Sequence, residues 1–209
     1  MKTVEVQLKN NIKVYGDCFE FSEFGDFQKI YQEWIYLNSL VKEKGGRNIN
    51  VPDVLSEGLF CLLFNAVRTN NDKNAGSYDC VLVETGDGVQ VKASSVAKDL
   101  TSFGPRSKWD LLCFADFAHS GMIDGKAYFY IIDNQLIERQ IVNKGENQTF
   151  TDQQAEKRRP RFSIKEKIIA PYQVKYICSL DILGSEIINV NGRYRITSYG
   201  IEKIECFQN

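Results

Sequence analysis

The feature that most constrains the fold of this chain is a pair of β-rich segments joined by a tight turn. Residues 78–83 and 89–93 are linked by Glu84-Thr85-Gly86-Asp87-Gly88, and an Asp-Gly pair between two such segments strongly indicates a hairpin. Asp79 lies near the start of the first segment, whereas Gln90 and Lys92 lie two residues apart on the second. Side chains alternate along a strand, so Gln90 and Lys92 share a face, and normal pairing brings Asp79 to the same edge.

Two helices are predicted before this hairpin. Residues 26–44 carry apolar side chains at helical spacing, and Gly45-Gly46 ends the pattern. A second helix is expected to begin after Pro52-Asp53, with apolar side chains recurring at helical spacing: Leu55, Leu59, Leu62, Leu63 and Val67. The alternating segments 4–8 and 12–15 indicate an N-terminal hairpin.

Apolar runs follow the central hairpin. Residues 109–117 and 127–132 are almost continuously apolar, which is typical of strands buried on both faces. Residues 133–170 are expected to be helical and rich in loops, and a last hairpin is expected around Asn191-Gly192. The order of elements predicts an α/β (α+β) fold with a mixed central sheet flanked by helices. We expect one domain over 1–209, with 1–16 as an N-terminal hairpin and 179–209 as a C-terminal appendage.

Composition excludes several classes of protein. The 209 residues include 43% hydrophobic and 25% charged residues, and the formal net charge is −1, as in many soluble globular proteins. No run is long enough to cross a bilayer, and the first residues do not resemble a signal peptide, so a cytoplasmic location is expected. The six cysteines show no C-x-x-C spacing, which favours buried free thiols. His119 is the single histidine, which excludes zinc sites built on two or three histidines, and we expect it in a loop facing solvent.

The residues of the central hairpin suit phosphodiester hydrolysis. Asp79 and Gln90 offer oxygen ligands for a hard cation such as Mg²⁺, which binds through few protein groups and substrate phosphate. Lys92 beside them can stabilise charge on the phosphorane or orient the attacking water.

In these residues the chain resembles the PD-(D/E)xK nuclease superfamily, with Asp79 as the motif aspartate and Lys92 as the motif lysine. Gln90 stands in the (D/E) position, a substitution found in the Mrr-like branch, and removes one negative charge from the metal site. Ser77-Tyr78 replaces the proline that can precede the aspartate. The resemblance implies a restriction-endonuclease-like core and a compensating carboxylate. Glu57, on the helix before the hairpin, is the first candidate, and Glu84 in the turn is the second.

A closer resemblance covers about 1–171. It rests on four stretches that look like a small family of short type II restriction enzymes, which cut an interrupted GC-type palindrome: Leu55-Ser56-Glu57-Gly58-Leu59-Phe60-Cys61, Gln90-Val91-Lys92-Ala93-Ser94-Ser95, Asp99-Leu100-Thr101-Ser102-Phe103-Gly104-Pro105 and Arg158-Arg159-Pro160-Arg161-Phe162-Ser163-Ile164. This resemblance implies a Mg²⁺-dependent site-specific deoxyribonuclease with Glu57, Asp79 and Gln90 as metal ligands and Lys92 completing the catalytic set.

Two segments are candidates for contact with double-stranded DNA. The first follows the catalytic lysine and offers hydroxyls and two cations suited to phosphate contact: Ser94, Ser95, Thr101, Ser102, Arg106 and Lys108. The second offers Arg158, Arg159 and Arg161, and arginine pairs in bidentate fashion with guanine. A solvated helix end explains the second run equally well.

Cleavage of both strands of a palindrome favours a homodimer. Two alternatives stay open at this point. One is another nuclease of the superfamily, Mrr-like or junction-resolving. The other is a non-catalytic DNA-binding protein on a decayed nuclease fold, which the glutamine at position 90 would suit.

Overall fold

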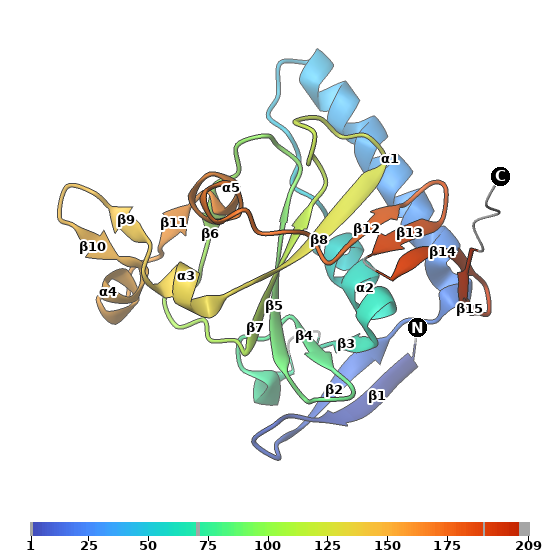
Figure 1. The fold of residues 1–209 in the computed structure, drawn as a ribbon, viewed down its shortest axis with the longest axis horizontal. Helices are drawn as coiled ribbons and strands as arrows, with labels where there is room; N and C mark the ends of the chain where they lie inside the picture. Colours follow the sequence, from blue (N-terminus) through green and yellow to red (C-terminus); the bar gives the residue numbers. More distant parts are fainter. Residues whose placement is uncertain (1, 70–71, 190, 205–209) are drawn as a thin grey trace.

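The central hairpin lies inside a long mixed sheet. The computed structural model describes residues 2–69, 72–189 and 191–204, and Figure 1 shows their arrangement. The main sheet has 11 strands in the order β1-β2-β3-β4-β5-β7-β8-β12-β13-β14-β15. Their bounds are β1 Lys2–Gln7, β2 Lys13–Cys18, β3 Ala66–Arg68, β4 Cys80–Leu82, β5 Gly88–Ser94, β7 Leu111–Asp116, β8 Lys126–Ile132, β12 Cys178–Asp181, β13 Glu186–Asn189, β14 Gly192–Thr197 and β15 Gly200–Lys203.

One pair of neighbours in this sheet is parallel. β5 and β7 run in the same direction, with Gln90 opposite Leu112 and Lys92 opposite Phe114. The other neighbouring strands of the described sheet are antiparallel. A mixed sheet flanked by helices confirms the predicted fold class.

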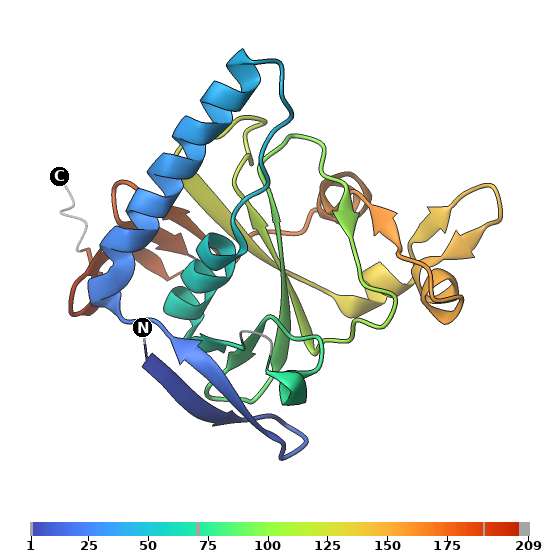
Figure 2. The same ribbon diagram turned by 180° about the vertical axis from the view of Figure 1, so that it is seen from behind.

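Two helices cover one face of the sheet. Figure 2 shows α1 (Phe24–Glu43) and α2 (Asp53–Phe64) on this face. Their buried side chains, among them Phe27, Trp34 and Leu59, form one core with strand residues such as Val91 and Cys113. α1 is followed by Gly45 at φ 75°. α2 ends at Asn65, in the left-handed region at φ 50°, and the chain turns there directly into β3.

The opposite face carries a second core and the shorter elements. Leu112 and Phe114 alternate with Cys113 on β7, as strand geometry requires, and pack with Phe103 and Phe162. The short elements are η1 Phe21–Glu23, η2 Lys73–Ala75, β6 Thr101–Ser102, α3 Asn134–Glu138, β9 Ile141–Asn143, β10 Gln148–Thr149, α4 Phe150–Ala155, β11 Arg161–Phe162, η3 Lys165–Ile169 and α5 Ala170–Tyr172. β9, β10 and α4 lie at the end of the molecule opposite the C-terminal strands (Figure 1).

Most of the predicted elements are confirmed, and their bounds shift by a few residues. The helix expected over 26–44 spans Phe24–Glu43, and both terminal hairpins form. The second helix ends at Phe64, and Val67, which was expected to be helical, lies in the unpredicted strand β3. Val190, which was expected in the last hairpin, falls outside the described residues. Residues 133–170 contain the short strands β9, β10 and β11, which the expectation of helices and loops missed. These strands are two or three residues long, too short to leave a periodic pattern.

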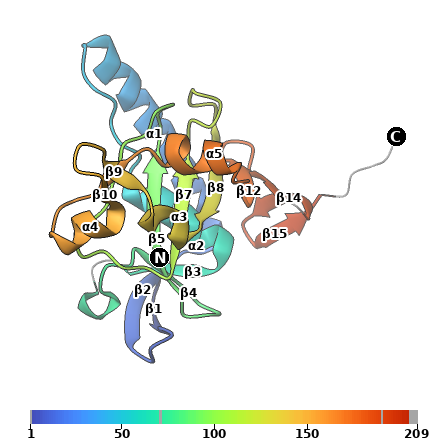
Figure 3. The ribbon, with the colours of Figure 1, turned by 60° about the vertical axis from the view of Figure 1, so that its left-hand side comes forward.

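The C-terminal strands extend the sheet. β12 pairs with β8 in antiparallel register, with Leu180 opposite Ala127, and Figure 3 shows β12, β14 and β15 continuing beyond β8. In the part of the chain that is described, we find no helix with the length and apolar character needed to span a membrane.

The cysteines and the histidine behave as expected. Cys61, Cys80, Cys113 and Cys178 are buried free thiols, and Cys18 is a partly buried one; Cys206 lies outside the described residues. His119 follows β7 in an exposed loop and stacks on Tyr128 with ring centroids 4.2 Å apart.

Candidate active site

The β4–β5 hairpin fixes the backbone around Asp79. Cys80 pairs with Val89 and Val81 with Gly88, and the Asp79 amide donates to the Val89 carbonyl at 2.9 Å. Gly88 is needed here, because a Cβ at this position would lie 2.3 Å from the Tyr78 ring. The Tyr78 ring thus packs directly on the start of β5.

The Asp79 carboxylate is held through one of its two oxygens. The backbone amide of Val91 donates to Asp79 Oδ2 at 2.8 Å, and the Gln90 side-chain amide donates to the same oxygen. Among the described residues, Oδ1 of Asp79 has no hydrogen-bond partner. Burial raises the pKa of Asp79, while Lys92 and the two hydrogen bonds act in the opposite direction.

Gln90 is buried beside this carboxylate. Its nitrogen is committed to Asp79, so the amide oxygen is the atom left to accept a bond or bind a cation. A neutral amide in this position satisfies Asp79 without adding a second charge to a buried site. Gln90 is therefore a partner of the aspartate as well as a potential ligand.

Lys92 shares the face of β5 with Gln90. Its ammonium lies 5.9 Å from the centroid of the Phe103 ring. Burial lowers the pKa of Lys92, and the charges of Asp79 and Glu57 oppose that shift. No carboxylate of the described residues lies within 4 Å of this ammonium, so it is not tied up in an ion pair. Lys92 can thus donate to a ligand entering the site.

Glu57 enters the site from α2. Its Oε2 lies 2.5 Å from the Nε of Arg68, and Arg68 also lies 3.3 Å from Asp53. Burial raises the pKa of Glu57 to about 7, with the Arg68 hydrogen bond acting against that rise and the charge of Asp79 adding to it. Glu84, the second candidate, is exposed in the β4–β5 turn. Arg68 was not identified from the sequence. Its only signal there is that a charged residue directly follows the apolar residues Ala66 and Val67.

A cleft joins these side chains. It has a volume of about 420 Å³ and is lined by Glu57, Asp79 and Lys92 together with Ser95 and Thr101. A smaller, polar cavity of about 230 Å³ adjoins it, and Asp53, Glu57 and Asp79 line both. The structure therefore brings all four predicted residues to one place, with the carboxylates between the two cavities.

The first predicted DNA-contact segment borders this cleft. Ser94 and Thr101 are buried and hydrogen bond within the segment, to Val96 and Asp99. Ser95 and Ser102 line the cleft, and the buried Ser102 hydroxyl has no hydrogen-bond partner among the described residues.

The two cations of this segment lie near Ser77 and Tyr78, the residues that precede Asp79. Arg106 and Lys108 are exposed and line a neighbouring cavity with Ser77 and Tyr78. The Ser77 hydroxyl bonds both the amide and the carbonyl of Lys108 at 2.8 Å. Exposed positive charge is thereby held next to the loop that carries Asp79.

The arginine segment approaches from the other side. Arg158, Arg159 and Arg161 are all exposed. Arg158 is paired with Glu146 and Glu156 at 3.5 and 3.6 Å, whereas the charge of Arg159 acts on Lys92 and lowers its pKa. Of the three arginines, Arg159 is thus the one whose charge acts on Lys92.

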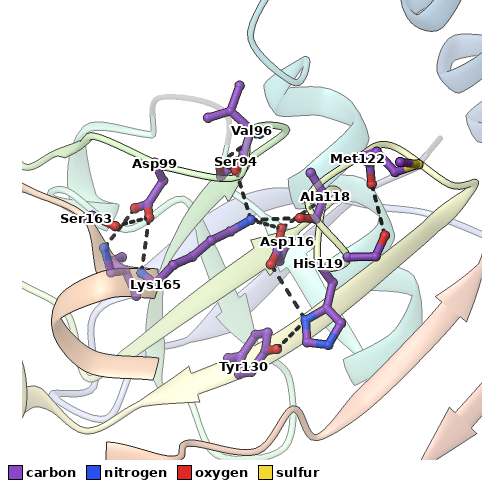
Figure 4. Close-up of polar contacts among 12 residues, drawn as sticks. Ser94, Val96, Asp99, Asp116, Ala118, His119, Met122, Tyr130, Ser163 and Lys165 are labelled. Carbon is purple, nitrogen blue, oxygen red and sulfur yellow. Dashed lines mark hydrogen bonds and ion pairs between the residues drawn. The ribbon is translucent and has the colours of Figure 1, made fainter. Parts of the chain in front are cut away.

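A buried network holds the two segments together. β6 and β11 pair antiparallel, with Arg161 opposite Ser102, and the rings of Phe103 and Phe162 stack 5.5 Å apart. Asp99 accepts hydrogen bonds from Ser163 Oγ at 2.6 Å and from the backbone amides of Ile164 and Lys165 (Figure 4). This arrangement was not visible in the sequence, because Asp99 and Ser163 are far apart along the chain.

Comparison with known proteins bears on what this site does. The model of the Bsp6I restriction endonuclease family matches residues 19–171. The chain belongs to the Bsp6I restriction endonuclease family. The Bsp6I-family match includes Glu57, Asp79, Gln90 and Lys92 and ends before β12. The type II restriction enzyme Bsp6I of Bacillus sp. (strain RFL6) is 31% identical over 170 residues, which cover 81% of this chain and 94% of that enzyme.

The prediction of a small type II restriction endonuclease is therefore confirmed at the level of the Bsp6I family. No solved structure matches the chain. The roles of individual residues rest on the geometry described above and on the chemistry that it allows.

Proposed function

We propose that this protein is a divalent-metal-dependent type II restriction endonuclease that hydrolyses phosphodiester bonds of double-stranded DNA at a short, GC-rich palindromic site. The observation that carries the proposal is the convergence of Glu57, Asp79 and Lys92 on one cleft, with Gln90 hydrogen-bonded to Asp79 beside it, in a chain of the Bsp6I family. Asp79, Gln90 and Lys92 come from one hairpin, and Glu57 comes from the helix that packs beside it.

The donor set of this site fits Mg²⁺. Glu57 and Asp79 are held by Oε2 and Oδ2, so each has a second oxygen without a partner among the described residues, and Gln90 has its amide oxygen. No group of three His, Cys, Asp or Glu side chains suited to a metal occurs in the described part of the chain. Two carboxylates and an amide match a cation that keeps several waters and takes phosphate oxygens. Bound there, Mg²⁺ would supply an activated water and neutralise charge on the phosphorane.

Lys92 is proposed as the group that acts on the substrate. Its ammonium has no carboxylate partner within 4 Å among the described residues and opens on the cleft, so it is available to donate to a phosphate oxygen or to the attacking water. Its pKa is lowered by burial, which makes this ammonium a better proton donor than that of an exposed lysine. Removal of a group that acts only in the transition state lowers kcat by about 100-fold or more.

The DNA is proposed to contact the cations on either side of the acidic centre. Arg106 and Lys108 lie on the side of Ser77, and Arg159 and Arg161 lie on the side of Ser102. Arginine recognises guanine through two hydrogen bonds, which supports a GC-rich target. We propose a homodimer, because a two-fold axis gives one active site to each strand of a palindrome.

Cleavage of plasmid DNA tests the function. We expect discrete fragments with Mg²⁺, none with EDTA, and a loss of about 100-fold or more in the cleavage rate of Asp79→Ala and Lys92→Ala. Products that depend on methylation or on branched structure would instead favour an Mrr-like or junction-resolving nuclease. DNA binding without cleavage under any divalent cation would favour a decayed nuclease fold. Lys167→Ala, an exposed residue away from the cleft, is the matched control and should cleave as wild type.

A further inference from the structure

Arg68 lies between the active-site helix and the strand that leads to Asp79. It is the last residue of β3. Asp53 and Glu57 lie one turn apart on α2, so they face the same side of the helix. The Arg68 guanidinium reaches both, with Nε 2.5 Å from Glu57 and Nη2 3.3 Å from Asp53.

The two contacts differ in burial. The side chains of Arg68 and Glu57 are 16% and 14% exposed, whereas that of Asp53 is 77% exposed. An ion pair in solvent contributes little to stability, so the contact with Glu57 is the one with energetic weight. Removing one partner of a buried ion pair leaves an uncompensated charge, and Arg68 is the cation that pairs with the buried Glu57.

Thr69, the residue after Arg68, hydrogen bonds to the backbone of the segment that carries Asp79. The Thr69 amide donates to the Asp79 carbonyl at 3.0 Å, and the Thr69 hydroxyl donates to the Tyr78 carbonyl at 2.5 Å. The pairing of Arg68 with Cys80 continues this contact into β4. Two consecutive residues therefore set the position of Glu57, through its side chain, and of Asp79, through its backbone.

Within the described part of the chain, Glu57 and Asp79 are each hydrogen-bonded through only one of their two carboxylate oxygens. Arg68 engages Oε2 of Glu57, and Val91 and Gln90 engage Oδ2 of Asp79. The second oxygen of each has no partner among the described residues, and both carboxylates line the same two cavities. The planar guanidinium of Arg68 contacts the carboxylates of Glu57 and Asp53. It therefore fixes the orientation of Glu57 in a way that a lysine ammonium does not.

We propose that Arg68 is a positioning residue that orients Glu57 so that its second oxygen can bind a divalent cation together with Asp79. This inference rests on the proposed function, since it assumes a cation between the two carboxylates. Arg68 acts through Glu57 and needs no contact with DNA. Residues that orient metal ligands in this way typically change metal affinity by about 10- to 100-fold when they are replaced.

Calorimetric titration of the DNA-free protein with Ca²⁺ tests the proposal without a cleavage assay. We expect Arg68→Gln to raise the Kd for Ca²⁺ by about 10-fold or more, and Arg68→Lys to lie between Arg68→Gln and wild type, because one ammonium can still bind Oε2. Arg195→Gln is the control, because Arg195 is an exposed arginine that pairs with Glu186 on β13 and lies on β14, several strands from β5 in the sheet. Its Kd should equal that of wild type.

A double-mutant cycle separates positioning from general structural damage. If Arg68 acts through Glu57, adding Arg68→Gln to Glu57→Gln should raise the Kd for Ca²⁺ no further. Additive losses, or a Kd for Arg68→Gln within about 2-fold of wild type, would overturn the inference. If Glu57→Gln and Asp79→Asn themselves bind Ca²⁺ as wild type does, the metal site of the proposed function fails instead. Arg68→Lys keeps the cycle usable should Arg68→Gln not fold.

Discussion

The Lys165 ammonium lies 2.5 Å from the Asp116 carboxylate, in a pair whose side chains are 14% and 3% exposed. Lys165 also donates to the carbonyls of Val96 and Ala118 at 2.9 and 3.1 Å (Figure 4). This side chain joins the helix after the arginine segment to the end of β7 and to the start of the loop after β5. This buried ion pair therefore acts with the Asp99 network to hold the segments that carry the DNA-contact candidates.

Replacement of this lysine is expected to destabilise the protein strongly. Lys165→Met leaves Asp116 buried without its cation, which costs about 3 kcal/mol in the free energy of unfolding. The double variant Lys165→Met/Asp116→Asn removes the unpaired charge and should recover part of that loss. Urea unfolding at neutral pH measures both, with Lys167→Met as the exposed control, which should change stability by less than about 0.5 kcal/mol. A double variant less stable than Lys165→Met would contradict this account.

A carboxylate at position 90 should change metal-free stability and metal affinity in opposite directions. In Gln90→Glu, the hydrogen bond to Asp79 Oδ2 is replaced by the repulsion of two buried carboxylates. We expect a lower Tm without metal, a larger rise in Tm on addition of Ca²⁺, and a Kd for Ca²⁺ that is lower by about 10-fold. Differential scanning calorimetry with EDTA and with Ca²⁺ makes the comparison. Equal Ca²⁺-induced shifts in wild type and variant would exclude Gln90 from the metal site.

The raised pKa of Glu57 predicts a pH-dependent difference between wild type and Glu57→Gln. In the folded protein Glu57 titrates at about 7, against 4.5 for the ordinary carboxyl. The folded state therefore binds the proton more tightly, so stability falls as pH rises from the lower value to the higher one. Between pH 5 and pH 8, wild type should lose about 3 kcal/mol relative to Glu57→Gln. Urea unfolding in EDTA at several pH values measures the free energy of unfolding of both proteins. Parallel plots of that free energy against pH for wild type and Glu57→Gln would refute the prediction.

The arginines of 158–161 should differ in their effect on DNA binding. Arg158 is already paired with two glutamates, whereas Arg159 is exposed and acts on Lys92. In a cleavage-deficient Asp79→Asn background, we expect Arg159→Gln to weaken binding and reduce the slope of log Kd against log salt by about 1. Arg158→Gln should change the slope less. Fluorescence anisotropy over a range of salt concentrations measures both, and equal slopes for the two variants would remove the distinction.

Much of the candidate site follows from local patterns. Asp79, Gln90 and Lys92 lie on one hairpin, and the alternation of strand side chains is enough to group them. Glu57 required one more step, because its place on α2 relies on helical spacing and on the resemblance to nucleases. These relations depend on periodicity within single elements, which a sequence displays directly.

The remaining features depend on pairings that periodicity does not encode. Arg68 closes a strand of only three residues, and nothing local indicates that its partners lie on α2. Lys165 is one of several cations in a basic run, yet it is largely buried against Asp116. Ser94 and Thr101 have hydroxyls suited to phosphate contact, but these hydroxyls hydrogen bond to Val96 and Asp99 in their own segment. These pairings form only when distant elements pack together, and composition alone cannot distinguish a buried lysine from a solvated one.

The parallel register of β5 and β7 has a consequence for how enzymes of this architecture diversify. Parallel neighbours cannot be joined by a tight turn and need a crossover of about a dozen residues or more. That crossover leaves β5 after Ser94, contributes Ser95 and Ser102 to the lining of the cleft, and returns at Leu111. Mutation and selection can therefore change the surface that borders the cleft while the strands that carry the proposed catalytic groups stay unchanged.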